Sequence, residues 1–170
     1  MTNSDQLVLD KKNIDTILVL DFGSQYTQLI ARRIRELDVF SIILPWDISK
    51  ERILEINPTG IILSGGPESV TNKNTPRIPE IIFDLEIPIL GICYGMQTLA
   101  EQFGGQVTAS STKEFGHASI TLEQASILFD GFDAGSLVDV WMSHGDHVST
   151  LPDQFLLIAS TPSAPIAAMP

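Results

Sequence analysis

Four apolar runs with the composition of β-strands alternate with segments of helical periodicity, and this alternation restricts the chain to a small set of folds. Strands that are apolar throughout and joined by helical crossovers are typical of a parallel sheet covered on both faces, with right-handed connections. Ligands of such folds bind at the carboxyl ends of the strands. The predicted strands are Thr16–Leu20, Phe40–Leu44, Gly60–Leu63 and Ile87–Ile92.

The helical segments are identified from a different periodicity. In Tyr26–Leu37, apolar residues recur at three- and four-residue steps, and polar side chains occupy the other side. A second helix is predicted over Met96–Phe103, where Gly104-Gly105 ends it. We expect the first helix to pack one apolar face on the sheet. That face consists of Tyr26, Leu29, Ile30, Ile34 and Leu37.

Beyond the second helix the sequence becomes rich in short strand-like stretches. The predicted fold class is therefore α/β, with a mostly parallel central sheet flanked by helices and a smaller strand-rich second half. The later stretches lie at Gly116–Thr121, Leu137–Trp141, Phe155–Ser160 and Ile166–Met169.

Composition limits the domain organisation and the partners. A chain of 170 residues that is 44% hydrophobic has enough material for one well-buried core and not for two full domains. We expect a loose leader over residues 1–13 and one domain over residues 14–170. The formal net charge of -11 argues against a nucleic-acid surface.

The sequence also suggests a compartment. It contains no run of roughly 18 consecutive apolar residues, the length that a membrane span requires, and no basic flank followed by an apolar stretch at Met1. The single cysteine cannot form an internal disulfide, which favours a reducing environment. We expect a cytoplasmic protein with no membrane partner.

That cysteine stands in the most informative motif. Gly91-Ile92-Cys93-Tyr94-Gly95 follows a predicted strand and precedes a predicted helix, so Cys93 lies at a sharp turn between small residues. This is the layout of a nucleophile elbow, in which the reactive atom projects beyond the strand and the helix N-terminus favours the thiolate. A lone cysteine can also be a small buried hydrophobe. The flanking glycines favour a nucleophile.

Two glycine-containing loops follow other strands. Ser64-Gly65-Gly66-Pro67 could present backbone N–H groups to a developing negative charge, or it could be a plain turn closed by proline. It lacks the Gly-Lys-Ser/Thr sequence of a phosphate-binding loop. Asp21-Phe22-Gly23-Ser24-Gln25 is interpreted as a structural turn in which Ser24 caps the first helix.

A third polar cluster, Ser143-His144-Gly145-Asp146-His147, directly follows the predicted strand Leu137–Trp141. Its imidazoles and carboxylate could serve Cys93 as general base and orienting group. The alternative is a polar turn bonded to local backbone. No metal site is expected, because the chain has three histidines, no second thiol and no helical histidine pair.

These motifs together carry a family resemblance. Gly91–Gln97, preceded by Ile61–Val70, resembles the class I (triad) glutamine amidotransferases, which have a flavodoxin-like fold. Leu20–Tyr26, Lys113–Gly116 and Trp141–Asp146 are similar to the GMP synthase branch of that family, rather than to anthranilate synthase or carbamoyl-phosphate synthase.

The resemblance implies residue roles. Cys93 would attack the side-chain amide of L-glutamine, form a γ-glutamyl thioester and release ammonia. The N–H groups of Gly66 and Tyr94 would stabilise the oxyanion, as both loops suggest. The ends of glutamine would be held by five residues, with His144 shaping the site rather than acting as base. They are Gln97, Ser143, His144, Gly145 and Asp146.

The chain also departs from the family pattern. The resemblance places the general base in a downstream His-Pro-Glu motif, which these 170 residues do not contain. We therefore expect a C-terminally truncated amidotransferase domain that is a poor glutaminase alone. It has no cofactor of its own, and the synthetase and dimerisation domains implied by the resemblance are absent. In the implied whole enzyme, a homodimer, the synthetase domain uses ATP and Mg²⁺ to aminate XMP to GMP.

Two other classes of function stay open on the residues alone. One is a different cysteine hydrolase on the same layout, using His144 or His147 as base, which activity in this chain would favour. The other is a non-catalytic binding module, which an unreactive Cys93 and no glutamine binding would favour.

Overall fold

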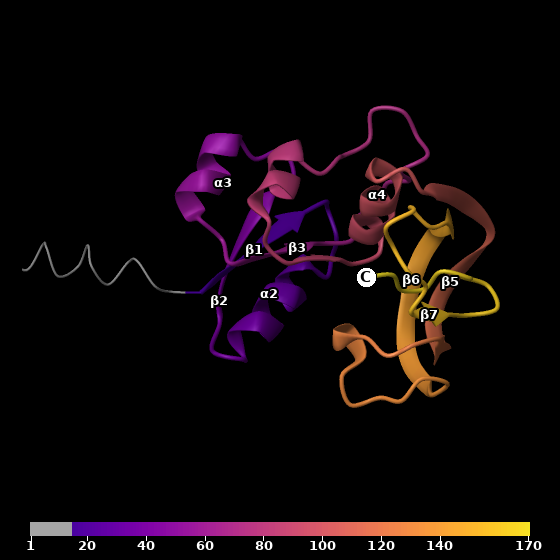
Figure 1. Ribbon diagram of the computed structural model, residues 1–170. Helices are drawn as coiled ribbons and strands as arrows, with labels where there is room; N and C mark the ends of the chain where they lie inside the picture. Colours follow the sequence, from indigo (N-terminus) through magenta and orange to yellow (C-terminus); the bar gives the residue numbers. More distant parts are fainter. Residues whose placement is uncertain (1–14) are drawn as a thin grey trace, which may run out of the picture.

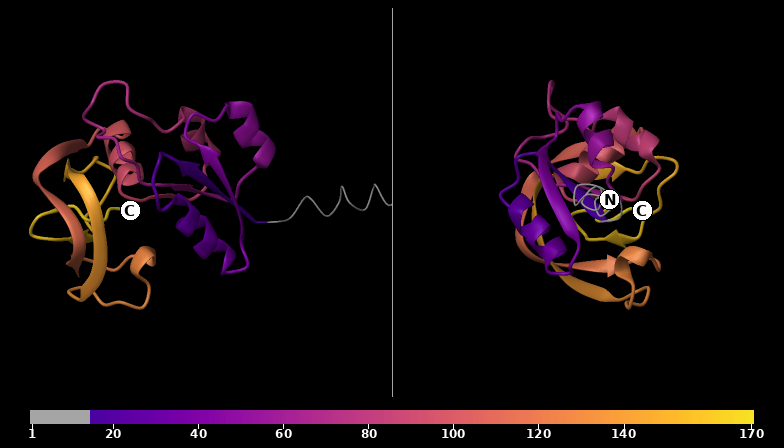
Figure 2. Two further views of the ribbon diagram at one scale, coloured as in Figure 1. Left: turned by 180° about the vertical axis from the view of Figure 1, so that it is seen from behind. Right: turned by 90° about the vertical axis from the view of Figure 1, so that its left-hand side faces the viewer.

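The structure, a computed structural model, describes residues 15–170, except for the side chains of residues 110–115. The expected leader lies outside the described residues. Two sheets stand side by side, as Figures 1 and 2 show from three directions. Sheet A holds four parallel strands in the order β2-β1-β3-β4, and sheet B holds three antiparallel strands in the order β6-β5-β7. The predicted α/β class is confirmed.

Sheet A follows the predicted strands closely, since its residues are mostly apolar and mostly buried or half-buried. Its strands are β1 (Thr16–Asp21), β2 (Phe40–Pro45), β3 (Gly60–Leu63) and β4 (Ile89–Gly91). The fourth is shorter than the predicted Ile87–Ile92. It is bounded by two residues of positive φ, Glu86 at 52° and Cys93 at 50°, which turn the chain on either side.

The helices lie on both faces of sheet A (Figure 1), with α2 (Thr27–Arg35) on one face and α3 (Lys50–Ile56) and the 3₁₀ helix η2 (Glu80–Leu85) on the other. Strand β1 serves both faces, because alternate side chains of a strand point in opposite directions. Leu18 and Leu20 join the main core under α3 and η2, where Ile53 and Ile82 are fully buried.

The predicted apolar face of α2 is wrong in part. Tyr26, Leu29 and Leu37 are 43%, 46% and 77% exposed, whereas Thr27 and Ala31 are buried against the sheet. Small side chains allow the helix to approach closely, and the Ser41 hydroxyl of β2 donates to the Ala31 carbonyl oxygen at 3.1 Å. The face of α2 that packs on the sheet is therefore not its most apolar stripe.

Sheet B is more regular than its sequence suggests. Strands β5 (Gln106–Leu122) and β6 (Leu137–Thr150) form a long hairpin, of which only the ends were predicted. A 3₁₀ turn, η3 (Ile127–Phe129), lies in their connection. Of the last two predicted strands, β7 covers only Ala159–Ser160, and residues 166–169 form isolated bridges.

The cluster Ser143–His147 was expected in a loop but lies inside β6. The pairing with β5 continues through it, from Phe115 opposite Ser143 to Ala109 opposite Asp146, with a register shift between Ala109 and Glu114. Residues 110–113 of β5 stand between Ala109 and Glu114, opposite the single residue Gly145 of β6, so the two strands are locally out of regular register.

Helix α4 (Tyr94–Gln102) joins the two sheets, because it packs on β3 and β4 and also on β5 and β6. Ala100 of α4 is buried in one cluster with Val148, Ile166 and Met169 of the second half. Cys93, the N-cap residue of α4, therefore lies where sheet A meets sheet B.

Candidate active site

Cys93 occupies the turn between β4 and α4 with φ 50° and ψ −110°, a strained conformation for a residue with a side chain. The residues two positions before and after it, Gly91 and Gly95, must be glycines. A Cβ on Gly95 would lie 2.3 Å from the Leu63 carbonyl oxygen, and one on Gly91 would lie 2.7 Å from the Met96 nitrogen. The predicted elbow geometry is confirmed.

The turn after β3 forms a second wall beside the thiol. A Cβ on Gly65 would lie 3.5 Å from Cys93 Cβ, and a Cβ on Gly66 would lie only 2.6 Å from the Phe22 carbonyl oxygen. The buried Ser64 hydroxyl fixes this approach, since it accepts from the Phe22 N–H at 3.1 Å and donates to the Gly65 carbonyl at 2.9 Å. Residue 66 must be glycine because any side chain there would collide with the Phe22 carbonyl oxygen.

Some backbone N–H groups at and near the N-terminus of α4 have acceptors, whereas two others have none among the described residues. The Gly95 N–H donates to the Ser64 carbonyl at 3.1 Å, and the Gln97 N–H donates to the Cys93 carbonyl at 3.0 Å. Within the described residues, the N–H groups of Tyr94 and Gly66 donate to no protein acceptor. Both residues line the same cavity as Cys93.

Strand β6 forms the opposite wall and is tied to α4. The buried Gln97 side chain donates from Nε2 to the Asp146 backbone oxygen at 2.8 Å. The Asp146 carboxylate has a buried oxygen, Oδ2, without a hydrogen-bond partner among the described residues. His144 Nε2 lies 3.3 Å from Met142 Sδ. A buried carboxylate oxygen without a donor is costly unless a ligand supplies one.

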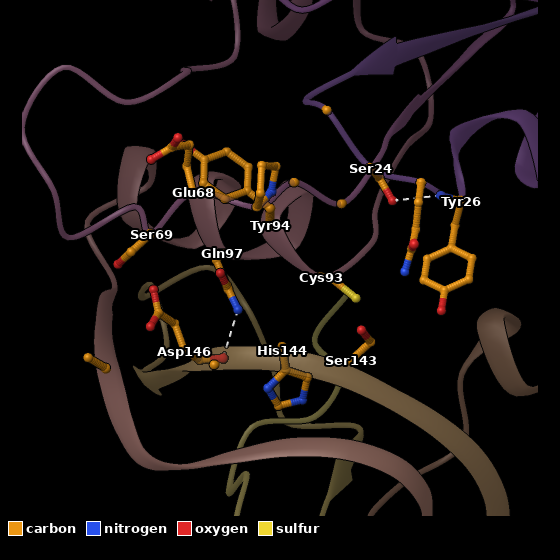
Figure 3. A pocket seen from close by; sticks show the side chains of 17 residues that line it. Ser24, Tyr26, Glu68, Ser69, Cys93, Tyr94, Gln97, Ser143, His144 and Asp146 are labelled. Atoms are coloured by element: carbon orange, nitrogen blue, oxygen red, sulfur yellow. Dashed lines mark hydrogen bonds between the residues drawn. The ribbon is translucent and has the colours of Figure 1, made fainter.

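The eight residues to which the family resemblance assigns a role line one cavity of about 590 Å³, whereas His147, the other candidate base, is not among its lining residues. Figure 3 shows Cys93 and Ser143 toward one end, Asp146 toward the other, and Gln97 between them. The cavity can hold a small polar molecule with a positively charged group at Asp146 and an electrophilic carbon at the thiol. The eight are Gly66, Cys93, Tyr94, Gln97, Ser143, His144, Gly145 and Asp146.

Comparison with known proteins decides the family. The family model for class-I glutamine amidotransferases matches residues 18–169. The chain belongs to this family. Among solved structures, this amidotransferase is similar to a GMP synthase subunit from Thermoplasma acidophilum, with TM-score 0.77 and 32% identity over 93% of this chain and 78% of that one. A glutamine amido transferase from Methylobacillus flagellatus, at 18% identity and TM-score 0.70, shows the fold alone.

Curated relatives with higher identity are longer than this amidotransferase. The chain is 59% identical over 159 residues to "GMP synthase [glutamine-hydrolyzing]" of Teredinibacter turnerae, and 57% identical over 160 residues to the protein of that name in Hahella chejuensis. Each match covers 90% of this chain and 30% of the relative. The chain therefore spans about a third of the length of these relatives.

Sequence reasoning missed part of this amidotransferase's cavity. Ser24, Gln25 and Tyr26 also line it, although the turn after β1 was given a structural role. The turn is indeed well bonded, because the Asp21 carboxylate accepts from the Gly23 N–H and the Thr27 hydroxyl. The signal was available, since the turns after β1, β3 and β4 must meet at one edge of a parallel sheet.

Glu68 and Ser69 were also missed as cavity residues, and both follow the glycine pair on the turn after β3. Figure 3 places them on the side of Asp146 rather than of Cys93. This end of the cavity therefore carries two carboxylates.

The thiol differs from the sequence-based expectation. Burial raises the pKa of the Cys93 thiol above its ordinary value, whereas the sequence suggested a thiolate favoured by the helix N-terminus. A thiol of raised pKa is almost wholly protonated at neutral pH. The amidotransferase must therefore remove a proton before Cys93 can react.

Other kinds of site find no support in the part of the chain that the structure describes. Residues 15–170, where described, contain no group of three or more His, Cys, Asp or Glu side chains that could hold a metal ion. In the same residues, no helix is long and apolar enough to cross a membrane.

Proposed function

We propose that this chain hydrolyses L-glutamine through Cys93 and supplies the ammonia to a GMP synthase reaction. The observation that carries the proposal is the convergence of a strained cysteine, two backbone N–H groups without a protein acceptor among the described residues and the residue Asp146 on one cavity. A nucleophile, donors for an oxyanion and a carboxylate for the substrate are what an amide-cleaving thiol enzyme needs besides a general base.

In the proposed reaction the thiol of Cys93 loses its proton and Sγ bonds to the side-chain carbonyl carbon of glutamine. The carbonyl oxygen becomes an oxyanion, which the N–H groups of Gly66 and Tyr94 stabilise. The C–N bond then breaks, and the departing nitrogen takes up a proton and leaves as ammonia. Water hydrolyses the γ-glutamyl thioester to glutamate and restores the thiol.

The cavity suits the two ends of glutamine. Asp146 lines the cavity, and its carboxylate would accept the substrate's ammonium group. Gln97 keeps this strand at a fixed distance from the thiol through its bond to the Asp146 backbone. Ser143, His144 and Gly145 would complete the binding wall opposite Cys93.

We further propose that these 170 residues alone are a weak glutaminase. Burial raises the pKa of the Cys93 thiol, and a protonated thiol attacks an amide poorly. Efficient turnover needs a base that takes the thiol proton and then returns one to the leaving nitrogen.

The names of the relatives extend the proposal to a whole enzyme. Proteins named GMP synthase [glutamine-hydrolyzing] match 90% of this chain with 30% of their own length. We propose that the chain works with a synthetase part, where ATP and Mg²⁺ activate XMP and ammonia converts it to GMP, in a cytoplasmic homodimer. This would be a carbon–nitrogen ligase of purine biosynthesis.

Protection of the thiol tests the glutamine site without requiring turnover. L-glutamine should slow alkylation of Cys93 by iodoacetamide saturably, whereas D-glutamine and L-asparagine should not. Cys93→Ala, which should take up no label, is the control. Equal labelling with and without L-glutamine would remove the basis of the proposal.

A further inference from the structure

The two N–H groups proposed to bind the oxyanion belong to different elements. That of Gly66 lies on the turn after β3, whereas that of Tyr94 lies at the start of α4. Stabilisation of a developing charge requires donors that are already fixed relative to each other. Some contact must therefore hold the turn against the helix.

The side chain of Tyr94 makes such a contact in two places. Its ring packs on Phe22 with a centroid separation of 5.4 Å, and the Phe22 backbone is the surface against which Gly66 lies. Its hydroxyl donates to the Pro76 carbonyl oxygen at 2.6 Å. Pro76 belongs to the same connection as Gly66, so one side chain fixes this connection at both ends.

A second side chain of α4 supports the far end of the connection. The Gln102 carboxamide accepts from the Ile78 N–H at 2.9 Å and donates to the Ile78 carbonyl at 3.0 Å. It binds the backbone as a neighbouring strand would. Together, Tyr94 and Gln102 make three hydrogen bonds from the helix of the nucleophile to the connection that carries Gly66.

The Tyr94 side chain has no exposed surface for another task. The residue is 2% exposed, and its hydroxyl is already bonded to Pro76. Burial is the largest of the causes that raise its pKa, so the phenol stays protonated and remains a donor.

We propose that the Tyr94 side chain is a positioning residue of the oxyanion hole, holding the Gly66 N–H in register with the N–H of Tyr94 itself. The inference rests on the proposed glutaminase function. Tyr94 would then supply one donor of the oxyanion hole from its backbone and align the other donor, the Gly66 N–H, through its side chain. Gln102 would assist from two turns further along α4.

The experiment separates substrate binding from acylation. The γ-p-nitrophenyl ester of L-glutamate acylates a thiolate without protonation of its leaving group. Sγ bonds to the carbonyl carbon, the C–O bond breaks, p-nitrophenolate leaves with the electron pair, and the thiol proton goes to solvent. Burst rates at increasing ester concentration give the acylation rate constant and the dissociation constant, after subtraction of the release with Cys93→Ala.

We expect Tyr94→Phe to lower the acylation rate constant about tenfold, because a displaced donor costs less than the hundredfold or more of a removed one. The dissociation constant should stay within about twofold, since the hole is filled only during reaction. Gln102→Leu should show the same pattern, which provides a second test if Tyr94→Phe folds poorly.

Ser41→Ala is the matched control, because it also removes a buried hydroxyl that donates to a backbone carbonyl, but far from the cavity. It should lower the melting temperature by a few degrees and leave acylation unchanged. Acylation of Tyr94→Phe and Gln102→Leu at the wild-type rate would overturn the inference, as would an equal loss in Ser41→Ala. Absence of any Cys93 acylation in the wild type would instead refute the proposed function.

Discussion

Glycines in the two halves of this molecule have different purposes. In the parallel half, a Cβ on Gly66, Gly91 or Gly95 would lie within 2.8 Å of backbone atoms of another segment. In the antiparallel half, Gly131 and Gly135 have positive φ values of 87° and 84°, and a Cβ would meet nothing within 4 Å. Glycine supplies space around Cys93 and backbone freedom in the connection between β5 and β6.

This difference shows where the site acquires its geometry. The enclosed glycines surround Cys93, where three βα turns of sheet A meet. Sheet B contributes a wall whose position depends on α4 and on the Gln97 bond to Asp146. Close backbone packing at glycines therefore shapes the turns around Cys93, whereas the β6 wall is connected to α4 by a side-chain hydrogen bond.

The largest expected effect comes from Gly95→Ala. Its Cβ would overlap the Leu63 carbonyl oxygen, so β3 and α4 must separate, and we expect a loss of about 3 kcal/mol of unfolding free energy. Urea denaturation measures this loss. Gly135→Ala is the matched control and should cost only about 1 kcal/mol, for its positive φ. Equal costs would remove the contrast between the halves.

The thiol offers a test of its burial. Because burial raises the pKa of Cys93, its alkylation rate should rise about tenfold per pH unit through the ordinary thiol range and continue rising above it. In urea the thiol loses its burial, and the rate should reach half of its plateau near the ordinary pKa of about 8.5. Iodoacetamide labelling followed by mass spectrometry measures both profiles. A folded protein whose rate levels off below pH 8 would show a thiolate stabilised by its surroundings.

Gln97→Leu tests the connection between the halves. The substitution removes the donor to the Asp146 backbone oxygen, so we expect a loss of about 1 to 2 kcal/mol of unfolding free energy. Hydrogen exchange should accelerate more in residues 143–148 than in sheet A. Gln28→Leu, on the exposed side of α2, is the control. Uniform acceleration of exchange in both sheets would argue against a local connection.

The smallest effect is expected at Trp141 of β6, whose side chain is 73% exposed. Trp141→Ser should change the unfolding free energy by less than about 0.5 kcal/mol, because little apolar surface is buried there. Thermal denaturation checks this value. A loss above about 1 kcal/mol would show that sheet B depends on side chains of its outer face.

Sequence reasoning was strongest where backbone geometry follows from residue type. The elbow at Cys93 was predictable because glycines flank it between a strand and a helix. The strands of sheet A were predictable because each contains a short run of apolar residues. The buried face of α2 was not, because close packing of Thr27 and Ala31 on the sheet outweighed the larger stripe through Leu29 and Leu37.

The interior of β6 was not predictable from local pattern either. Polar residues that line the cavity break the alternation at Ser143–Asp146, and the pairing with β5 includes a register shift that no turn residue indicates. The residues of the site were found through motif and resemblance, whereas their place in a strand required the structure. The raised pKa of Cys93 likewise depends on burial by distant segments.

The most direct test of the account is the intact mass of the chain after brief mixing with the γ-p-nitrophenyl ester of L-glutamate and acid quenching. The account predicts one γ-glutamyl group, located on Cys93 by peptide mapping, absent from Cys93→Ala and strongly reduced with the ester of D-glutamate. A chain that gains no group, or gains it with both enantiomers and on other residues, would contradict a glutamine-specific thiol at this site.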